Sequence, residues 1–443
     1  MKKINIYIIL MPLLAMLVWS CEKDNYDPPT TSFTGQLVYN GKPFPFNGNT
    51  DVGEGSEIIQ LFQHGFGKNG SLNVRVNQDG HFSSLLFNGE YAMIFKDQEF
   101  PFVFDEWPMK VNGRTDTVYV SLNGNKHMEI PVTPYFDITD VEYNVGVTAV
   151  EAGFNIQKVL DGANVRRAYI YMSTAVNVNR NTRLSKVVDV NDINDRVSFR
   201  IPFDEYRNHP DYKNNYRDYA YLRVAIETDK ASEFLWSPVY KLEGIPLQTS
   251  EEDITKQYLK NAGPGFDCDY SPQYTRWGDC VYNGLLCTPK EWTVNDTIKI
   301  YDDNDGVFWG GADMRWDRDR ICVVNWDVTD RLVLNGKIYQ TTTLPAGKYV
   351  LSAMFEELHA DHGTQNHCYM IINKGNQNMP DWDNRTKAFE YADVASSSSI
   401  EFELTEETTL TIGFLYNFPT IGEKCAYGFD RIKLAQITSE NEE

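Results

Sequence analysis

Short stretches in which apolar and polar residues alternate run through most of the chain. A period of two is typical of β-strands with one buried face, because successive side chains point to opposite faces of a sheet. The alternation is clearest at residues 72–76, 197–201, 222–226, 400–404 and 410–414. Stretches with the helical period are scarce, and the clearest helix candidate runs from Glu251 to Asn261. The pattern predicts an all-β protein built from several tandem β-sandwiches.

The beginning of the chain predicts export. Lys2 and Lys3 precede an apolar run of 14 residues, which is shorter than the roughly 20 that a membrane-spanning helix needs. The run ends in Leu17-Val18-Trp19-Ser20 directly before Cys21. This arrangement resembles the bacterial lipobox, in which a diacylglycerol is attached to the cysteine thiol, although Trp19 stands where a small residue is usual. An ordinary signal peptide followed by a cysteine is the alternative.

The acidic stretch Glu22-Lys23-Asp24-Asn25 resembles the tag that sends lipoproteins of the Bacteroidetes to the outer face of the outer membrane. A merely solvated tether is the alternative. We therefore expect residues 1–20 to be a lipoprotein signal peptide and residues 21–32 a tether. In this interpretation, a lipid on Cys21 anchors the protein to the outer membrane, facing the cell exterior.

Charge and composition exclude several classes of protein. The chain has 62 acidic and 41 basic residues, a net charge of −21, which disfavours nucleic acid as a partner. Hydrophobic residues make up 42% and aromatic residues 13% of the chain, enough for packed cores, so it is not a disordered protein.

Residues 33–135 are predicted to form the first module. Several short motifs resemble the prealbumin-like domains called carboxypeptidase regulatory-like domains, in which an Asp-Gly-x-Phe step forms a hairpin turn whose aromatic residue plugs the core. The motifs are Thr34-Gly35-Gln36-Leu37-Val38, Asn40-Gly41-Lys42-Pro43, Asp79-Gly80-His81-Phe82 and Gly89-Glu90-Tyr91. The resemblance implies a scaffold and not an active site.

Residues 136–247 carry short strands at the spacing of an immunoglobulin- or fibronectin-like sandwich. Together with the first module, this segment is similar to an uncharacterised two-module lipoprotein family of the Bacteroidetes, whose members tend to be encoded beside outer-membrane glycan importers. That resemblance implies a TonB-dependent glycan importer complex as a partner.

Residues 254–443 are predicted to form the third module, after a polar and acidic boundary at 247–253. Three motifs resemble galactose-binding-like jelly rolls, which often serve as carbohydrate-binding domains: residues 258–263, Leu344-Pro345-Ala346-Gly347-Lys348-Tyr349, and residues 428–434. The second motif predicts a turn that leads into a strand with Tyr349, Leu351, Ala353 and Phe355 on one face.

Tryptophan is concentrated in this third module, which holds six of the nine. A flat indole offers an electron-rich face to the C–H faces of a sugar ring, and neighbouring carboxylates and amides can bind the hydroxyls. We therefore predict a shallow carbohydrate site with candidate residues Trp309, Trp316, Trp382, Asp317 and Asn384. The alternative is that these tryptophans pack in the core or support loops.

Two clusters suggest metal. Asp303 and Asp305, in the run Asp302-Asp303-Asn304-Asp305-Gly306, could hold a structural calcium ion, although the complete calcium-loop pattern is missing and a plain acidic turn is the alternative. His359, His362 and His367 could bind zinc, or form a polar loop at the rim that contacts a ligand. We expect that the protein requires no cofactor.

Six cysteines lie in the third module, and an even number in an exported protein suggests disulfides without fixing their pairing. Some could equally remain buried thiols. The disulfide candidates are Cys268, Cys280, Cys287, Cys322, Cys368 and Cys425.

No nucleophile elbow, phosphate-binding glycine loop or paired-cysteine zinc spacing occurs in the sequence. We therefore expect a non-catalytic protein that binds a polysaccharide or oligosaccharide as accessory to a glycan import system. Two alternatives stay open: a glycoside hydrolase or esterase with its site in the third module, and a structural or adhesive protein that binds another protein.

Overall fold

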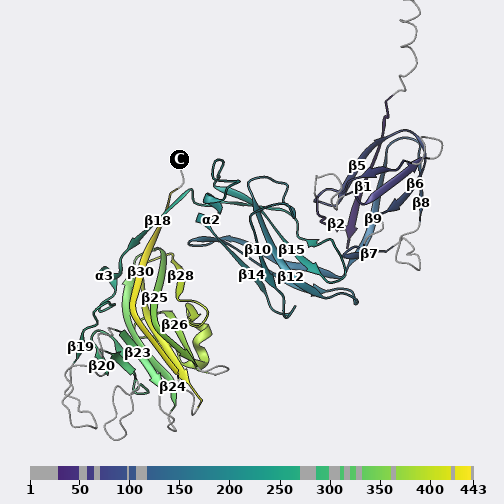
Figure 1. The fold of residues 1–443 in the computed structure, drawn as a ribbon. Coiled ribbons are helices and arrows are strands. Elements are labelled where there is room, and N and C mark those ends of the chain that lie inside the picture. Colours follow the sequence, from purple (N-terminus) through teal and green to yellow (C-terminus); the bar gives the residue numbers. More distant parts are fainter. Residues whose placement is uncertain are drawn as a thin grey trace, which may run out of the picture. The chain divides into compact units, whose positions relative to one another are not determined.

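The protein is an assembly of β-sandwiches with very little helix (Figure 1). The computed structural model describes residues 28–48, 57–63, 70–96, 99–105, 117–269, 286–298, 310–313, 320–325, 332–360, 366–420 and 425–440. The predicted all-β class is confirmed. Within these residues, no helix is both long and apolar enough to cross a membrane.

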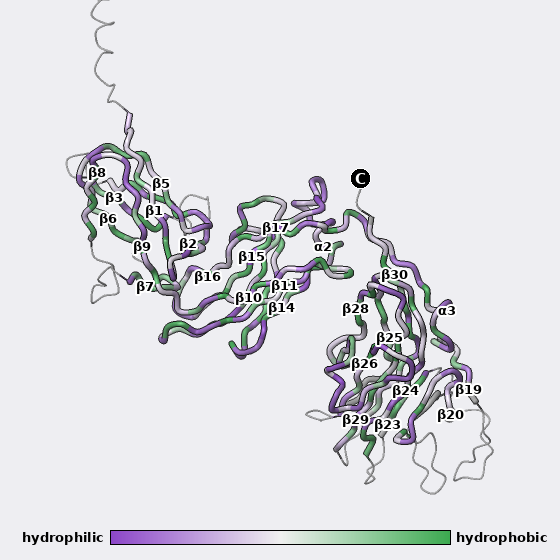
Figure 2. Tube along the Cα trace, turned by 180° about the vertical axis from the view of Figure 1, so that it is seen from behind, coloured by the Kyte–Doolittle hydropathy of each residue, from purple (hydrophilic) through white to green (hydrophobic). Residues whose placement is uncertain are grey.

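The chain folds as two compact units. Residues 1–144 and 150–245 belong to one unit, which contains two sandwiches, and residues 145–149 and 246–443 belong to the other, which contains the third. Along the strands of each sandwich, hydrophobic and hydrophilic positions alternate as the period-two pattern requires (Figure 2).

The first sandwich has a five-stranded and a four-stranded sheet. The five-stranded sheet has the order β2-β1-β9-β7, and β5 pairs with β1. Its strands are β1 (Thr31–Tyr39), β2 (Lys42–Pro43), β5 (His81–Leu86), β7 (Phe102–Phe104) and β9 (Lys126–Pro134). The four-stranded sheet, in the order β4-β3-β6-β8, consists of β3 (Ile59–Gln63), β4 (Leu72–Val74), β6 (Gly89–Phe95) and β8 (Val118–Leu122).

The predicted core aromatic of the first sandwich is Phe82, and the structure confirms it. Its side chain is only 1% exposed and meets Phe33 edge to face, with ring centroids 5.5 Å apart. Gly35 lies directly against this ring: a Cβ atom at Gly35 would fall 2.1 Å from Phe82 Cζ and 2.5 Å from the carbonyl oxygen of Met128. Only glycine fits there, so the motif residues Gly35 and Phe82 form one packing unit.

The second sandwich has a three-stranded and a five-stranded sheet. The three-stranded sheet, in the order β10-β11-β14, consists of β10 (Phe136–Val145), β11 (Ala149–Lys158) and β14 (Val197–Pro202). The five-stranded sheet has the order β13-β12-β15-β16, with β17 beside β15, and consists of β12 (Val165–Ser173), β13 (Ser185–Asp189), β15 (Tyr219–Thr228), β16 (Leu235–Trp236) and β17 (Tyr240–Glu243). A short helix, α2 (Phe203–Asn208), follows β14.

Arg223 joins the first two sandwiches. Its side chain is 0% exposed, and its guanidinium lies 4.6 Å from the ring centroid of Trp236. The guanidinium donates to four main-chain carbonyl oxygens: from Nη2 to Phe46 (2.7 Å) and Gln78 (3.0 Å) in the first sandwich, and from Nε to Ser237 (2.7 Å) and from Nη1 to Val178 (3.2 Å) in the second. The buried guanidinium of Arg223 thus connects the first two sandwiches through hydrogen bonds.

Further polar contacts support this joint. Asn47 Nδ2 donates to Glu233 Oε2 at 3.0 Å, and both side chains are buried. Gln78 reaches from the first sandwich to the second with both ends of its amide: Nε2 donates to the carbonyl of Val176, and Oε1 accepts from the amide of Val178. Buried polar groups are costly unless they are hydrogen-bonded, so these contacts favour one arrangement of the two sandwiches.

The third sandwich has an eight-stranded and a five-stranded sheet. The first has the order β19-β20-β22-β23-β30-β25-β28, with β18 beside β30: β18 (Gln248–Asp253), β19 (Cys268–Asp269), β20 (Leu286–Pro289), β22 (Gly310–Asp313), β23 (Arg320–Asn325), β25 (Gly347–Ala360), β28 (Ser399–Leu404) and β30 (Cys425–Glu440). The second has the order β21-β24-β29-β26-β27: β21 (Thr293–Val294), β24 (Val333–Leu344), β26 (His367–Lys374), β27 (Glu390–Asp393) and β29 (Thr408–Phe418).

One large apolar core of the third sandwich contains residues from both sheets, among them Phe414 and Phe429, which stack with centroids 4.1 Å apart. The predicted inward face of β25 is confirmed at Tyr349, Leu351 and Ala353, which are buried, and Phe355 packs against the same core. The hydroxyl of Tyr349 donates to the carbonyl of Pro345 at 2.8 Å.

Two expectations near the start of the third sandwich are wrong. The sequence predicts a boundary at 247–253, but Gln248–Asp253 form β18, which pairs antiparallel with β30. The strand is almost entirely exposed, so it lacks the buried face that would mark it in the sequence. The helix expected from Glu251 to Asn261 is limited to α3 (Thr255–Tyr258), because its first residues belong to that strand.

Candidate functional site

The described candidates for a carbohydrate site are Trp382 and Asn384, both in the 3₁₀ helix η3 (Trp382–Lys387) of the third sandwich. Trp309, Trp316 and Asp317 lie outside the described residues. Trp292, another tryptophan of this module, is buried in the core and donates from Nε1 to the carbonyl of Asn261, as the core-packing alternative predicts for it.

The segment that carries Trp382 covers the outer face of the five-stranded sheet. Ile371 of β26, Leu415 of β29 and Met379 form a small buried cluster there, outside the main core. The partly buried Trp382 and Tyr369 pack against that cluster. The period-two alternation explains the placement: the odd-numbered residues of β26 point outwards, while Cys368, Met370 and Ile372 belong to the main core.

Trp382 stands at the centre of a group of aromatic side chains. Its indole meets Tyr369 edge to face with centroids 5.4 Å apart, and lies 6.3 Å from the imidazole of His367. Tyr391 of β27, which is 43% exposed, lies 6.3 Å from Tyr369. The guanidinium of Arg385 lies 4.1 Å from the centroid of Trp382 and 5.1 Å from that of Tyr369. We call these five residues the aromatic face.

Asp381 holds this segment to the sheet. Its Oδ1 accepts from Lys337 Nζ at 2.7 Å and from Asn335 Nδ2 at 2.8 Å, both on β24. These two contacts hold the pKa of the Asp381 carboxyl below its ordinary value. The amide of Trp382 itself donates to Asn335 Oδ1 at 2.9 Å, so the backbone beside the indole is fixed.

Polar groups surround the aromatic face. His367 Nδ1 and Asp393 Oδ2 are hydrogen-bonded at 3.1 Å, and Asn384 Oδ1 accepts from Lys387 Nζ at 3.0 Å. Asn384 is exposed and belongs to the same 3₁₀ turn as Trp382. Aromatic rings next to amide, carboxylate and cationic groups can bind a ring that is apolar on its faces and hydroxylated at its edge.

Sequence reasoning missed Tyr369, Arg385 and Tyr391. A usable signal was present, because Tyr369 and Tyr391 sit in alternating strands on either side of the Trp382 segment, and Arg385 follows Trp382 by one 3₁₀ turn. Trp382 is also more enclosed than expected, since Arg385 lies over its ring and the side chain is only partly exposed.

Most of the residues predicted to bind a metal ion lie outside the described residues. Asp303, Asp305 and His362 are not among the described residues, and for His359 only the backbone is described. Among the described side chains, no group of three or more potential ligands is positioned to hold a metal ion. The expectation of a structural calcium ion therefore stays a prediction.

Two disulfide candidates are buried thiols: Cys322 on β23 and Cys368 on β26. Both thiols lie near the buried hydroxyl of Tyr416, and burial among them raises the pKa of that phenol well above its ordinary value. Cys280 lies outside the described residues, as do the side chains of Cys268, Cys287 and Cys425. Cys21, the candidate for lipidation, is also outside them.

Three segments of the chain match known family models. Residues 31–133 match "Protein of unknown function (DUF3823) N-terminal domain", residues 136–241 match "Domain of unknown function (DUF3823_C)" and residues 260–413 match "Domain of unknown function (DUF5013)". The protein is thus an all-β, multidomain chain with DUF3823 and DUF5013 domains. No curated protein matches it.

Several solved structures are similar to about half of the chain. A DUF3823 family protein from Parabacteroides merdae is 27% identical over 49% of this chain and all of its own, with a TM-score of 0.40. One from Bacteroides ovatus is 28% identical over 48% of this chain and 99% of its own, with a TM-score of 0.38. A protein from Bacteroides uniformis described as a "putative carbohydrate binding protein" is 14% identical, with the same coverage and a TM-score of 0.38.

Proposed function

We propose that this protein binds a glycan through the aromatic face of its third sandwich. The observation that carries the proposal is the meeting of Trp382, Tyr369 and Tyr391, from three different elements, on one outer sheet face. Sugar rings stack on such side chains through their C–H faces. The carboxylates of Asp381 and Asp393 and the amide of Asn384 lie beside them as partners for hydroxyl groups.

Affinity at one such face is expected to be weak. Tyr391 is only 43% exposed and Trp382 only partly so, which leaves room for contact with one or two sugar rings. A polymeric glycan presents the same unit many times, and several copies of a surface-anchored protein can engage one chain, which raises the overall avidity without new contacts.

In our proposal the protein acts at the outer face of a bacterial outer membrane. The signal-peptide and lipobox pattern before Cys21 supports an anchor, and the acidic residues after it support surface exposure. The first two sandwiches then serve as a rigid spacer, as the buried Arg223 joint supports. The captured glycan would pass to a TonB-dependent importer beside it.

The test of the binding site is affinity electrophoresis and calorimetry of the purified protein with a panel of plant, microbial and host polysaccharides. One glycan should bind, and Trp382→Ala and Tyr391→Ala should each weaken its binding by about tenfold, equivalent to about 1.4 kcal/mol. The matched control is Tyr119→Ala, because Tyr119 is 78% exposed on the first sandwich and far from the site in the sequence.

Unchanged binding in the Trp382 and Tyr391 variants would remove the aromatic face from consideration. Release of new reducing ends during the same incubations would instead support the alternative of a glycoside hydrolase. Co-purification of an importer from detergent-solubilised membranes without any bound glycan would support the protein-binding alternative.

The anchor has its own test. Replacing Cys21 by alanine should abolish labelling with radioactive palmitate and move the protein out of the membrane fraction. Because the proposed anchor leaves the protein facing the cell exterior, protease added to intact cells should digest the wild-type protein. A palmitate label that persists in the Cys21→Ala variant would contradict the proposal.

A further inference from the structure

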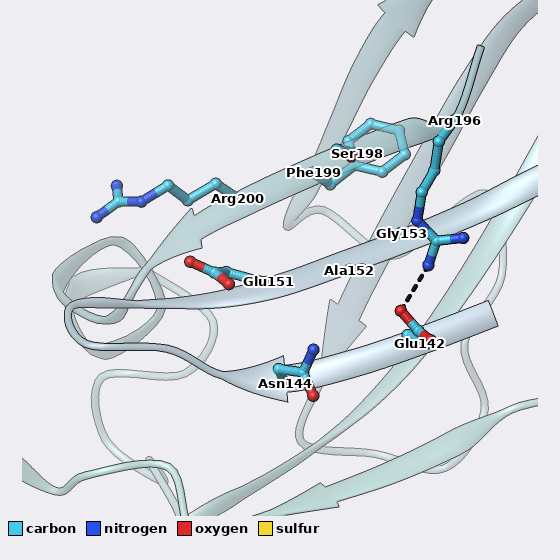
Figure 3. Close-up of a pocket in the computed structure, with 9 residues that line it drawn as sticks. All are labelled: Glu142, Asn144, Glu151, Ala152, Gly153, Arg196, Ser198, Phe199 and Arg200. Carbon is cyan, nitrogen blue, oxygen red and sulfur yellow. Dashed lines mark hydrogen bonds and ion pairs between the residues drawn. The ribbon is translucent and has the colours of Figure 1, made fainter. Parts of the chain in front are cut away.

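A polar groove of about 400 Å³ lies on the outer face of the three-stranded sheet in the second sandwich. Figure 3 shows residues of all three strands lining it: Glu142 and Asn144 from β10, Glu151 and Gly153 from β11, and Ser198 and Arg200 from β14, with Arg196 just before β14. The volume lies within the range of small-ligand sites. None of its lining residues belongs to the aromatic face.

Gly153 has no side chain and therefore leaves room for the side chain of Arg196 on the floor of the groove. A Cβ atom there would lie 2.9 Å from Nε and 3.1 Å from Nη2 of Arg196, closer than such contacts normally occur. Arg196 therefore lies flat across the strand at this point instead of projecting into solvent (Figure 3). Its neighbour on the same strand face, Ser198, is small, so the centre of the sheet face stays hollow.

One end of the groove is preorganised by Arg196. Its Nη2 donates to Glu142 Oε2 at 2.7 Å and to the carbonyl of Asp140 at 3.3 Å, and its Nη1 donates to Asn155 Oδ1 at 3.4 Å. Asn155 in turn donates to Asp140 Oδ2 at 2.9 Å. These contacts fix the guanidinium and the carboxylate side by side, so that end presents donors and acceptors together.

The other end contains a second guanidinium and a second carboxylate. Arg200 and Glu151 lie there, and Asn144 adds an amide at the side (Figure 3). Arg196 and Arg200 are four residues apart along an extended segment, so their backbones are separated by roughly 13 Å. That span matches a ligand of two linked six-membered rings rather than a single small ion.

The charges of the lining balance. The lining contains two guanidiniums and two carboxylates, so a strongly anionic ligand would meet Glu142 and Glu151, and a cation would meet Arg196 and Arg200. A vicinal diol fits better, because adjacent hydroxyl groups can each donate to a carboxylate and accept from a guanidinium. We propose that the groove is a binding site for a neutral saccharide, about a disaccharide unit in length.

This site lies in a different module from the aromatic face, and the inference stands whether or not that face binds a glycan. The test uses calorimetry of the whole protein carrying Trp382→Ala, titrated with neutral disaccharides and oligosaccharides and, separately, with oligogalacturonate. The background substitution weakens the other proposed site, so the groove is identified by the part of the binding that responds to substitutions in its own lining.

A neutral saccharide should bind, and adding Arg200→Ala or Asn144→Ala should weaken it at least fivefold, while Ser198→Tyr should block it by filling the floor. The matched control is Arg167→Ala, because Arg167 also pairs with a carboxylate, that of Asp189, but on the other sheet of the same sandwich. Circular dichroism spectra of all variants establish that they are folded.

Absence of neutral-saccharide binding in the Trp382→Ala protein would overturn this inference and leave the proposed function to its own test. Tighter binding of oligogalacturonate than of any neutral saccharide would overturn the assignment of ligand class. Equal weakening by Arg167→Ala would show that the groove is not the site.

Discussion

The guanidinium of Arg385 lies 4.1 Å from the ring centroid of Trp382, three residues earlier in the same 3₁₀ turn, and Arg385 Nη1 donates to the carbonyl oxygen of Trp382 at 2.9 Å. The arginine thus holds the indole that it covers. Because Arg385 also lies 5.1 Å from the ring of Tyr369, the cation links η3 to β26. The tryptophan is held in place before any ligand arrives.

We predict that Arg385→Ala lowers the free energy of unfolding of the third sandwich by about 1 kcal/mol, the usual contribution of a partly exposed cation–π contact. Arg385→Lys should recover part of the loss, since it keeps the charge without the planar group. Denaturant unfolding followed by circular dichroism measures both. The control is Arg431→Ala at an exposed position of β30, and an equal loss there would contradict the prediction.

Arg223→Ala should lower the free energy of unfolding much more than Arg385→Ala does. It removes the guanidinium from three buried carbonyl oxygens, those of Phe46, Val178 and Ser237, and opens a cavity beside Trp236, so we expect a loss of at least about 3 kcal/mol. Burial lowers the pKa of Arg223 to about 9, which still leaves the group charged at neutral pH. Arg223→Lys keeps a charge but cannot reach all four acceptors, so an intermediate loss is expected.

Denaturant unfolding of the two variants measures how much free energy of unfolding each has lost. Limited proteolysis shows whether the segment between the first two sandwiches has become accessible to protease. Arg183→Ala is a matched control, because Arg183 belongs to the same sandwich but is an exposed ion-pair partner of Asp211. If Arg223→Ala were as stable as Arg183→Ala, the joint would not depend on this cation.

We predict that the stability of this joint between the first two sandwiches depends on pH, because the carboxyl of Glu233 is buried there. Burial raises the pKa of its carboxyl above the ordinary value of 4.5, against smaller opposing effects of Arg180 and the Asn47 hydrogen bond. A raised folded-state pKa means that the folded protein holds the proton more tightly than the unfolded chain. The contribution of Glu233 to stability is therefore complete below about pH 4.5 and is lost as pH rises through the folded-state value.

Glu233→Gln removes this titration while keeping a similar shape. The variant should gain stability relative to the wild type as pH rises from about 4.5 towards neutral, and denaturant melts across that range measure the difference. Glu129→Gln, at an exposed position of β9, serves as control. A difference between Glu233→Gln and the wild type that did not change with pH would show that the carboxyl does not titrate in this way.

Gly35 and Phe82 should behave as a coupled pair. Gly35→Ala places a methyl group 2.1 Å from Phe82 Cζ and should cost about 1–3 kcal/mol, and Phe82→Ala opens a cavity in the core and should cost about 3 kcal/mol or more. In the double variant, the new methyl group occupies part of the space that the ring has left. The double variant should therefore lose clearly less than the sum of the two single losses.

A double-mutant cycle from denaturant unfolding measures this coupling. Gly70→Ala with Phe82→Ala is the comparison, since a Cβ atom at Gly70 meets nothing within 4 Å. Strict additivity of Gly35→Ala and Phe82→Ala would contradict the packing described here.

Most of the fold could be predicted because its strands have one buried face. Leu410, Ile412 and Phe414 alternate with polar or small residues, and they lie in the core of the third sandwich as expected. β18 could not be found in this way, because an edge strand that is exposed on both faces carries no hydrophobic alternation. Its pairing with β30 depends on main-chain hydrogen bonds, which leave no trace in side-chain type.

The sites were harder to predict for a different reason. Tryptophan content pointed to the third module and to Trp382, but the neighbours of that indole come from strands brought together by tertiary pairing, such as Tyr369 and Tyr391. The groove in the second sandwich depends on a missing side chain at Gly153, and a glycine in a strand has many possible reasons.

All four acceptors of Arg223 are main-chain oxygens, a group that every residue supplies. The hydrogen bonds of Arg223 therefore place no demand of their own on the side chains at positions 46, 78, 178 and 237, as long as the backbone keeps its path. Only the donor is restricted to one amino acid. A joint of this kind makes the arginine, and the tryptophan on which it lies, the side chains with the strictest requirement, while its acceptors require only the path of the backbone.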